Sequence, residues 1–158
     1  MLPLGADSVK RAFVISGIPR PAPFRLFPAS GWAAMSAPRS RRNVAIVDDD
    51  PGMLRGLSDL LGACGFETDV FSSAEEWLDR GDFHRIDCLL LDVQLGGISG
   101  IELQRQLNAL GSRLPIVFMT AFDDEETRAQ ASQAGCLGWL RKPFSSRQLI
   151  EAIERAAS

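Results

Sequence analysis

Four short segments of the chain carry side chains that can accept or hold a phosphoryl group. In chain order they are Asp48 with Asp49, then Asp92, Thr120 and Lys142. An aspartate carboxylate is a weak nucleophile, so it accepts a phosphoryl group only where the protein positions it and neutralises the added charge. A lysine, a hydroxyl and neighbouring acids that can hold a cation would supply these needs. The residue types therefore indicate a site at which one of the chain's own aspartates becomes phosphorylated.

Asp92 stands at the most informative of these positions. It ends an apolar run that begins at Ile86, and Gly96, Gly97 and Gly100 follow closely. An apolar run of this length bounded by glycine predicts a strand that is buried on both faces. A carboxylate at the carboxyl end of such a strand lies where open α/β sheets bind ligands. We therefore expect Asp92 to be the acceptor.

From residue 43 onward, short apolar runs alternate five times with amphipathic stretches. The expected strands are residues 43–47, 67–71, 87–92, 115–119 and 136–140. Helix caps are expected at Asp50, Ser73 and Ser145, and the acidic turn 123–126 favours the start of the fourth helix. Five such βα units predict a doubly wound, five-stranded parallel sheet of the flavodoxin-like (βα)5 type, with strand order 2-1-3-4-5.

That strand order brings the candidate residues together. The first, third, fourth and fifth strands become neighbours, so their carboxyl ends line one crevice. Each of these four strands has one of the four phosphoryl-site segments described above at its carboxyl end. The second strand, residues 67–71, carries none and is the outlying edge. The chemistry and the topology therefore point to the same place.

The same segments resemble the receiver domain of two-component response regulators. The matching motifs are Val47-Asp48-Asp49-Asp50, Leu91-Asp92-Val93 with Gly97-Ile98-Ser99-Gly100, Met119-Thr120-Ala121 and Lys142-Pro143-Phe144. The resemblance covers residues 43–156. It implies that Asp92 accepts a phosphoryl group from a sensor histidine kinase or a phosphotransfer protein. It also implies that an unknown downstream protein reads the change, and that the protein is a monomer or a phosphorylation-dependent dimer.

The resemblance also assigns roles around the acceptor. Mg²⁺ is the implied cofactor, bound directly by Asp49, Asp92 and the backbone carbonyl of Gln94, with Asp48 acting mainly through water. Lys142 is implied to pair with Asp92 or with a phosphoryl oxygen, as a compact point charge.

Further along the chain, the resemblance implies a switch and a backbone feature. Thr120 is implied to bond the phosphoryl group, and Trp139 stands at the position of the aromatic switch residue. The peptide bond between Lys142 and Pro143 is implied to be cis, a form that only X-Pro bonds adopt cheaply.

One loop departs from the family pattern. The segment after the acceptor is usually Met-Pro-Gly-Met, whereas this chain has Leu95-Gly96-Gly97-Ile98. Glycine in place of proline gives the backbone more freedom, so we expect a looser loop.

Residues 1–42 differ in composition from the rest of the chain. They hold six of the nine prolines, and seven lysines and arginines against one acid. Their apolar patches are broken before any helical or strand period develops. We expect a disordered or mis-annotated basic leader, with the true start at Met35, followed by a receiver domain at residues 43–158. A transit peptide is the alternative that a basic, serine-containing leader leaves open.

Composition excludes several other classes. Residues 43–158 hold nineteen acids and ten basic residues, which argues against direct nucleic-acid binding. No stretch approaches the ~18 apolar residues of a membrane span. The three cysteines lack the spacing of a zinc site or a disulfide framework. We therefore expect a cytoplasmic protein. Because little chain follows the last helix, we also expect a single-domain regulator with no output domain.

Most candidates also have a structural explanation. Asp50 is expected to be only a cap, and Trp139 can be ordinary core. His84, the sole histidine, is expected on the surface. The acidic turn 123–126 is expected to be a solvated helix start.

Two other function classes share some of these features. A small phosphatase of the haloacid dehalogenase type also forms an aspartyl phosphate, and Asp48-Asp49-Asp50 superficially matches its Asp-x-Asp motif. However, Pro51 and Gly52 stand where threonine or valine should complete that motif, and its cap domain is missing. A receiver fold that works without phosphate would not need the acceptor-site residues. We therefore expect a phosphate-accepting signalling domain and not an enzyme.

Overall fold

The computed structural model describes residues 41–80 and 83–158. The leader expected at residues 1–42 lies outside the described residues except for its last two positions, and so does Met35, the expected true start of the protein. The first strand, β1, spans Asn43–Val47 and so begins at the residue expected to open the domain.

The sheet contains five parallel strands in the order β2-β1-β3-β4-β5. The strands are β1, β2 (Glu67–Phe71), β3 (Cys88–Asp92), β4 (Ile116–Thr120) and β5 (Gly138–Arg141). The predicted doubly wound, flavodoxin-like fold and its strand order are confirmed. Thr120 lies inside β4, one position further than the expected end of that strand, and is paired in register with Arg141 of β5.

Five helices alternate with these strands. They are α1 (Pro51–Ala63), α2 (Ala74–Arg80), α3 (Gly100–Ala109), α4 (Glu125–Gln133) and α5 (Ser146–Ala156). β5 begins two residues later than expected. The reason is that the amide of Cys136 still donates to the carbonyl oxygen of Ala131 at the end of α4.

Two of the three expected caps are complete. The Asp50 side chain accepts hydrogen bonds from two amides of the first turn of α1. Ser145 and Gln148 form a reciprocal capping box on α5. The box expected at Ser73 is only half formed. Its hydroxyl accepts from the amide of Glu76, but the Glu76 carboxylate accepts from the amide and hydroxyl of Ser72 instead.

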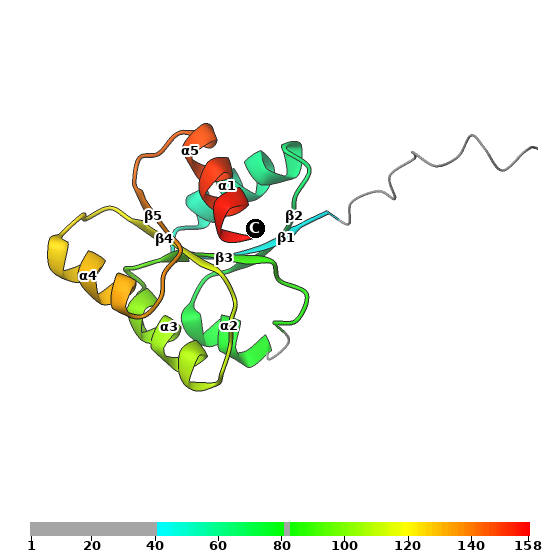
Figure 1. Cartoon of the computed structure of the whole chain (residues 1–158). Helices are drawn as coiled ribbons and strands as arrows, with labels where there is room; N and C mark the ends of the chain where they lie inside the picture. The colour runs from blue at the N-terminus through cyan, green and yellow to red at the C-terminus, as the bar shows by residue number, and fades with distance from the viewer. Residues whose placement is uncertain (1–40, 81–82) are drawn as a thin grey trace, which may run out of the picture. The chain divides into compact units, whose positions relative to one another are not determined.

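The helices cover both faces of the sheet, with α1 and α5 on one face and α2, α3 and α4 on the other (Figure 1). Alternate residues of the central strand β3 supply the two cores. Leu89 and Leu91 pack on the α2–α4 side, and Cys88 and Leu90 on the α1–α5 side. β3 and β4 are buried at every position, which holds their carboxyl ends rigidly side by side.

The remaining expectations from composition concern cysteines and membranes. Cys88 is buried, and burial raises the pKa of its thiol to about 12, so it behaves as a core residue. Within residues 41–80 and 83–158, the structure has no helix with the length and apolar character needed to cross a bilayer.

Candidate functional site

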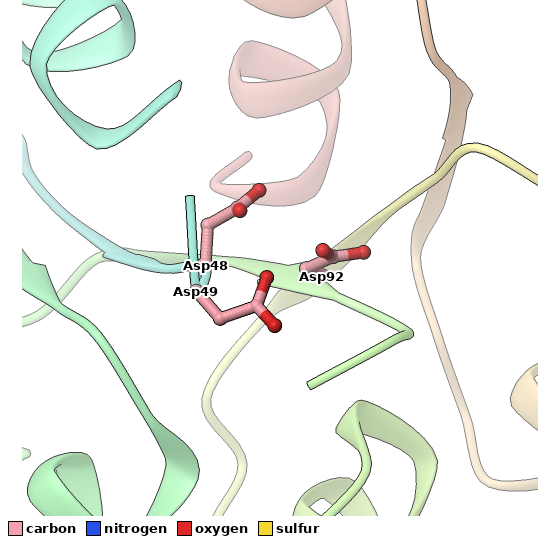
Figure 2. Close-up of side chains that lie close together, drawn as sticks. All are labelled: Asp48, Asp49 and Asp92. Carbon is pink, nitrogen blue, oxygen red and sulfur yellow. The ribbon is translucent and has the colours of Figure 1, made fainter. Parts of the chain in front are cut away.

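Three carboxylates meet at the carboxyl edge of the sheet. Asp48 and Asp49 directly follow β1, and Asp92 is the last residue of β3. One oxygen from each lies within 4.8 Å of the others (Figure 2). Asp48 is only 1% exposed and Asp92 6%, whereas Asp49 is exposed. The topology therefore crowds three acids into one partly buried cluster, as the sequence predicts.

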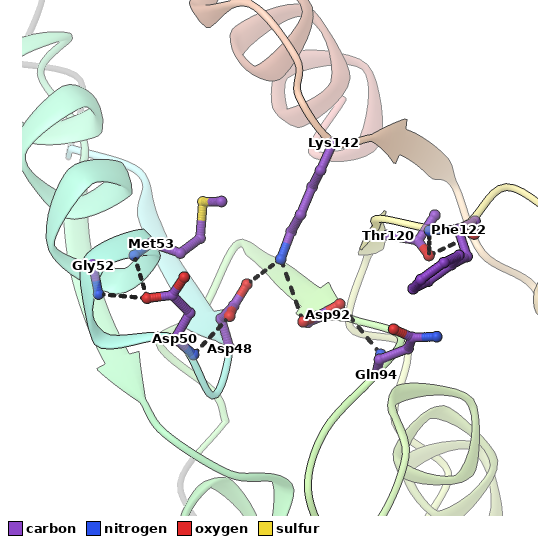
Figure 3. Close-up of polar contacts among 9 residues, drawn as sticks. All are labelled: Asp48, Asp50, Gly52, Met53, Asp92, Gln94, Thr120, Phe122 and Lys142. Atoms are coloured by element: carbon purple, nitrogen blue, oxygen red, sulfur yellow. Dashed lines mark hydrogen bonds and ion pairs between the residues drawn. The ribbon is translucent and has the colours of Figure 1, made fainter.

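Lys142 reaches this cluster from the end of β5. Its Nζ donates to Asp48 Oδ2 at 2.6 Å and to Asp92 Oδ2 at 3.3 Å (Figure 3). The peptide bond between Lys142 and Pro143, which follows β5, is cis, as the family resemblance implies. The pairing with Asp92 follows the expectation from the family. The shorter contact with Asp48 was not expected, because sequence spacing does not say which carboxylate the ammonium group reaches.

Burial and charge shift the proton affinities of this cluster. Burial raises the pKa of Asp92, the charge of Asp48 adds to that rise, and Lys142 and the Gln94 amide oppose it without cancelling it. Burial opposes the charged form of Lys142, but its bond to Asp48 and the charges of Asp92 and Asp48 raise the pKa above its ordinary value. The cluster thus sets one ammonium group, bound to Asp48 and Asp92, beside three carboxyl groups.

The individual oxygens show which carboxylate is free for a cation. Asp48 uses Oδ1 to accept from the Asp50 amide at 2.9 Å and Oδ2 to bind Lys142. Asp92 uses Oδ1 to accept from the Gln94 amide at 3.2 Å. Among the residues that the structure describes, none pairs with the Asp49 carboxylate. A set of oxygen donors with one free carboxylate fits Mg²⁺, which takes few protein carboxylates and keeps waters.

Gly100 sets how closely α3 approaches Asp92. A Cβ at this position would lie 2.3 Å from the backbone oxygen of Asp92. The amide of Gly100 also donates to the carbonyl oxygen of Val93. Only glycine leaves room for this approach. The sequence motif included Gly100, but it did not reveal this reason.

The side chain of Thr120 binds the segment that directly follows β4. Its hydroxyl is buried, donates to the carbonyl oxygen of Phe122 at 2.7 Å and accepts from the Phe122 amide at 3.1 Å (Figure 3). The hydroxyl is therefore bound to the segment that leads into α4.

Trp139 belongs to a second charged cluster, formed by Asp123, Arg128 and Trp139 and called here the Trp139 cluster. Its indole Nε1 donates to Asp123 Oδ1 at 3.1 Å, and Arg128 binds both oxygens of Asp123 at 2.7 and 2.8 Å. The Arg128 guanidinium also lies 5.8 Å from the centre of the Trp139 ring. Trp139 is half-buried and packs against Phe118 at the edge of the core on the α2–α4 side, so its ring contacts the core while its indole nitrogen binds Asp123.

The acidic turn 123–126 is exposed at every position, as expected of a solvated helix start. Asp124 caps α4, and Glu125 and Glu126 lie in its first turn. Asp123 has in addition a contact that the sequence did not predict, because its side chain binds Arg128 and the indole of Trp139. No local sequence pattern indicates the contact, since Asp123 lies in the turn before α4 and Trp139 lies 16 residues later, on β5.

Comparisons with known proteins agree with this geometry. The response regulator receiver domain family matches residues 44–154. The response regulator protein TodT of Pseudomonas putida is 36% identical over 113 residues, which make up 72% of this chain and 50% of TodT. The transcriptional regulatory protein FixJ of Bradyrhizobium diazoefficiens is 32% identical over 117 residues, 74% of this chain and 57% of FixJ.

Solved structures are similar as well. The chain matches a structure of the response regulator StyR at 40% identity with a TM-score of 0.66, over 75% of this chain and 60% of that chain. It spans about half the length of TodT and of the other curated relatives at the same level of identity.

Proposed function

Because the chain belongs to the response regulator receiver domain family, we propose that Asp92 is its phosphoryl acceptor. The single observation that carries this proposal is the position of Asp92. It is a buried carboxylate at the end of the central strand, in contact with Lys142 and within 4.8 Å of two further acids. The family is a signalling domain, which favours this function over a phosphatase.

The proposed donor is a phosphohistidine of a sensor kinase or a phosphotransfer protein. An Asp92 carboxylate oxygen forms a bond to phosphorus as the phosphorus–nitrogen bond breaks, and the imidazole leaves with that electron pair. Lys142 already lies 3.3 Å from Asp92 Oδ2, so its ammonium group can offset the charge of the transferred group. The domain contributes positioning and charge, which are the main needs of phosphoryl transfer.

We place Mg²⁺ at the acidic cluster, held by Asp49, Asp92 and the Gln94 backbone carbonyl, with Asp48 acting through water. The free carboxylate of Asp49 supports its direct role, and the two occupied oxygens of Asp48 support its indirect one. When bound, Mg²⁺ supplies positive charge that offsets the crowded carboxylates and the incoming phosphoryl group.

The output follows from Thr120 and Trp139. A phosphoryl group on Asp92 adds acceptor oxygens, and the Thr120 hydroxyl turns toward them and leaves Phe122. Asp123 follows Phe122 directly and holds the Trp139 indole. Movement of this segment then releases Trp139, and the surface of α4 and β5 changes. The domain is an equilibrium of two packings, and the phosphate favours one of them.

Incubation of the full chain with acetyl phosphate and Mg²⁺ tests the acceptor. Intact-mass measurement should find one base-labile phosphoryl group. Asp92→Asn should abolish it, and Asp48→Asn should slow its formation. Asp87→Asn is the matched control, because Asp87 is exposed and directly precedes β3, at the end of the strand opposite to Asp92. Phosphate that persists on the Asp92→Asn protein would overturn the proposal, and phosphate found on Asp48 would favour the phosphatase.

A further inference from the structure

We propose that Glu75 is a positioning residue for the acceptor loop, residues 94–98, and that it holds this loop in place for Mg²⁺ and phosphoryl binding. The proposal rests on the function proposed above for Asp92. The loop follows the acceptor directly and contains Gln94, whose amide binds Asp92 Oδ1. Whatever fixes the loop therefore also fixes one side of the site.

The contact comes from a neighbouring helix. Glu75 lies in the first turn of α2, and its Oε1 accepts a hydrogen bond from the Ile98 amide at 2.9 Å. Leu95 and Ile98 are half-buried and pack against the core beneath α2 and α3. The apolar side chains thus hold the inner side of the loop, and Glu75 holds its backbone from the outside.

The glycine at position 97 leaves space for this carboxylate. A Cβ there would lie 2.4 Å from Glu75 Oε1, closer than real side chains approach. Neither Gly96 nor Gly97 has the positive φ that requires glycine. The absence of a side chain at Gly97 therefore serves the Glu75 contact and not a special backbone conformation.

Glu75 also compensates for the departure of this loop from its family. Proline is usual at the position of Gly96, and glycine there gives the unrestrained backbone more freedom. A bond to the Ile98 amide restricts that freedom two residues away. The same bond is the main reason why the pKa of Glu75 lies below its ordinary value, so the carboxylate is ionised at neutral pH and the bond is charge-assisted.

Glu75→Ala in the full chain tests the contact directly. Without Mg²⁺, hydrogen exchange of the Ile98 amide, followed by NMR, should become about tenfold faster, because its acceptor is gone. The Mg²⁺ dissociation constant, measured by calorimetry, should rise about threefold, within the range of one lost hydrogen bond. Glu75→Gln keeps an acceptor oxygen and should restore most of both values.

The matched control is Glu76→Ala. Glu76 is the next carboxylate on α2, but it binds Ser72 and not the loop. The Glu76→Ala variant should keep the rate of Ile98 amide exchange and the Mg²⁺ affinity near the wild-type values. If Glu76→Ala and Glu75→Ala changed both quantities equally, the effect would belong to α2 as a whole and the proposal would fail.

Gly97→Ala supplies an independent test. Its methyl group should displace the Glu75 carboxylate and speed Ile98 exchange as Glu75→Ala does. In a Glu75→Ala background, the same substitution should have no further effect or should slow exchange. Additive losses would overturn the proposal. The proposal would also fail if Glu75→Ala kept the wild-type rate of Ile98 exchange and the wild-type Mg²⁺ affinity while Asp92 was still phosphorylated. Failure of Asp92 phosphorylation in the wild type, with the exchange results as expected, would instead refute the proposed function and leave the loop contact standing.

Discussion

The acceptor cluster, formed by Asp48, Asp92 and Lys142, and the Trp139 cluster both pair a basic side chain with aspartate, and they differ mainly in burial. In the acceptor cluster, Lys142 binds Asp48 and Asp92, and the three side chains are 16%, 1% and 9% exposed. In the Trp139 cluster, Arg128 binds Asp123, and these side chains are 55% and 22% exposed. The buried cluster lies at the proposed phosphoryl-acceptor site, and the exposed one holds the half-buried indole of Trp139.

The difference in burial predicts a difference in what each cluster can do. Breaking a buried ion pair leaves a charge without solvent or partner, so the acceptor cluster is costly to disturb. An exposed pair is worth little, because water and salt replace the lost partner. The acceptor cluster is therefore suited to holding a fixed charge arrangement, and the Trp139 cluster is suited to opening and closing.

Loss of the basic residue should separate the two clusters most strongly. Lys142→Met leaves Asp48 and Asp92 buried without their cation and should lower the free energy of unfolding by about 3 kcal/mol. Arg128→Met should lower it by less than about 1 kcal/mol. Urea denaturation without Mg²⁺ measures both, and Arg147→Met, which breaks an exposed pair with Glu151, is a control for Arg128. Equal losses for Lys142 and Arg128 would contradict the comparison.

The pH dependence of stability should show the strain inside the buried cluster. Burial raises the pKa of Asp92 in the folded protein, so the folded state holds this proton more tightly than the unfolded chain. Ionised Asp92 therefore lowers the free energy of unfolding, and this loss is fully present at a pH above the raised pKa of the folded state. As pH falls through its raised pKa, the wild type recovers stability, and the recovery is complete below the ordinary value near 4.

Asp92→Asn, which cannot ionise, should consequently have a higher urea midpoint than the wild type at pH 7. The advantage should shrink as the pH falls through the folded pKa of Asp92. Asp87→Asn serves as the exposed control for removal of one carboxylate. An advantage of Asp92→Asn that stayed constant between pH 7 and pH 3 would show that burial of this charge is not its cause.

The smallest expected effect is on Trp139 itself. Salt at about 1 M screens exposed charges, so the Trp139 indole proton signal should shift toward its position in Asp123→Asn. Beryllofluoride with Mg²⁺, which mimics a phosphoryl group, should move the signal in the same direction, and Thr120→Ala should reduce that movement. Trp139→Phe assigns the signal among the three tryptophans. A signal that responds to salt but not to the mimic would separate the Trp139 cluster from the switch.

Much of the fold was predictable because it depends on local periodicity. The apolar runs and caps placed five strands and five helices, and they placed Asp92 at the end of the central buried strand. The bounds of β1 and β2 were correct to the residue. Errors occurred where a backbone bond continued a helix, as at Cys136, or where a side chain chose another partner, as Glu76 does.

The sequence by itself thus determined the sheet, its strand order and the set of residues that meet at its carboxyl edge. Only the tertiary structure decided which of them touch. Lys142 binds Asp48 more closely than Asp92, Asp123 binds Trp139, and Glu75 binds the amide of Ile98. The physical reason is that side-chain period along the chain is a local property. A hydrogen bond between distant segments depends instead on their relative placement, which the packing of the whole domain sets to within a fraction of an ångström.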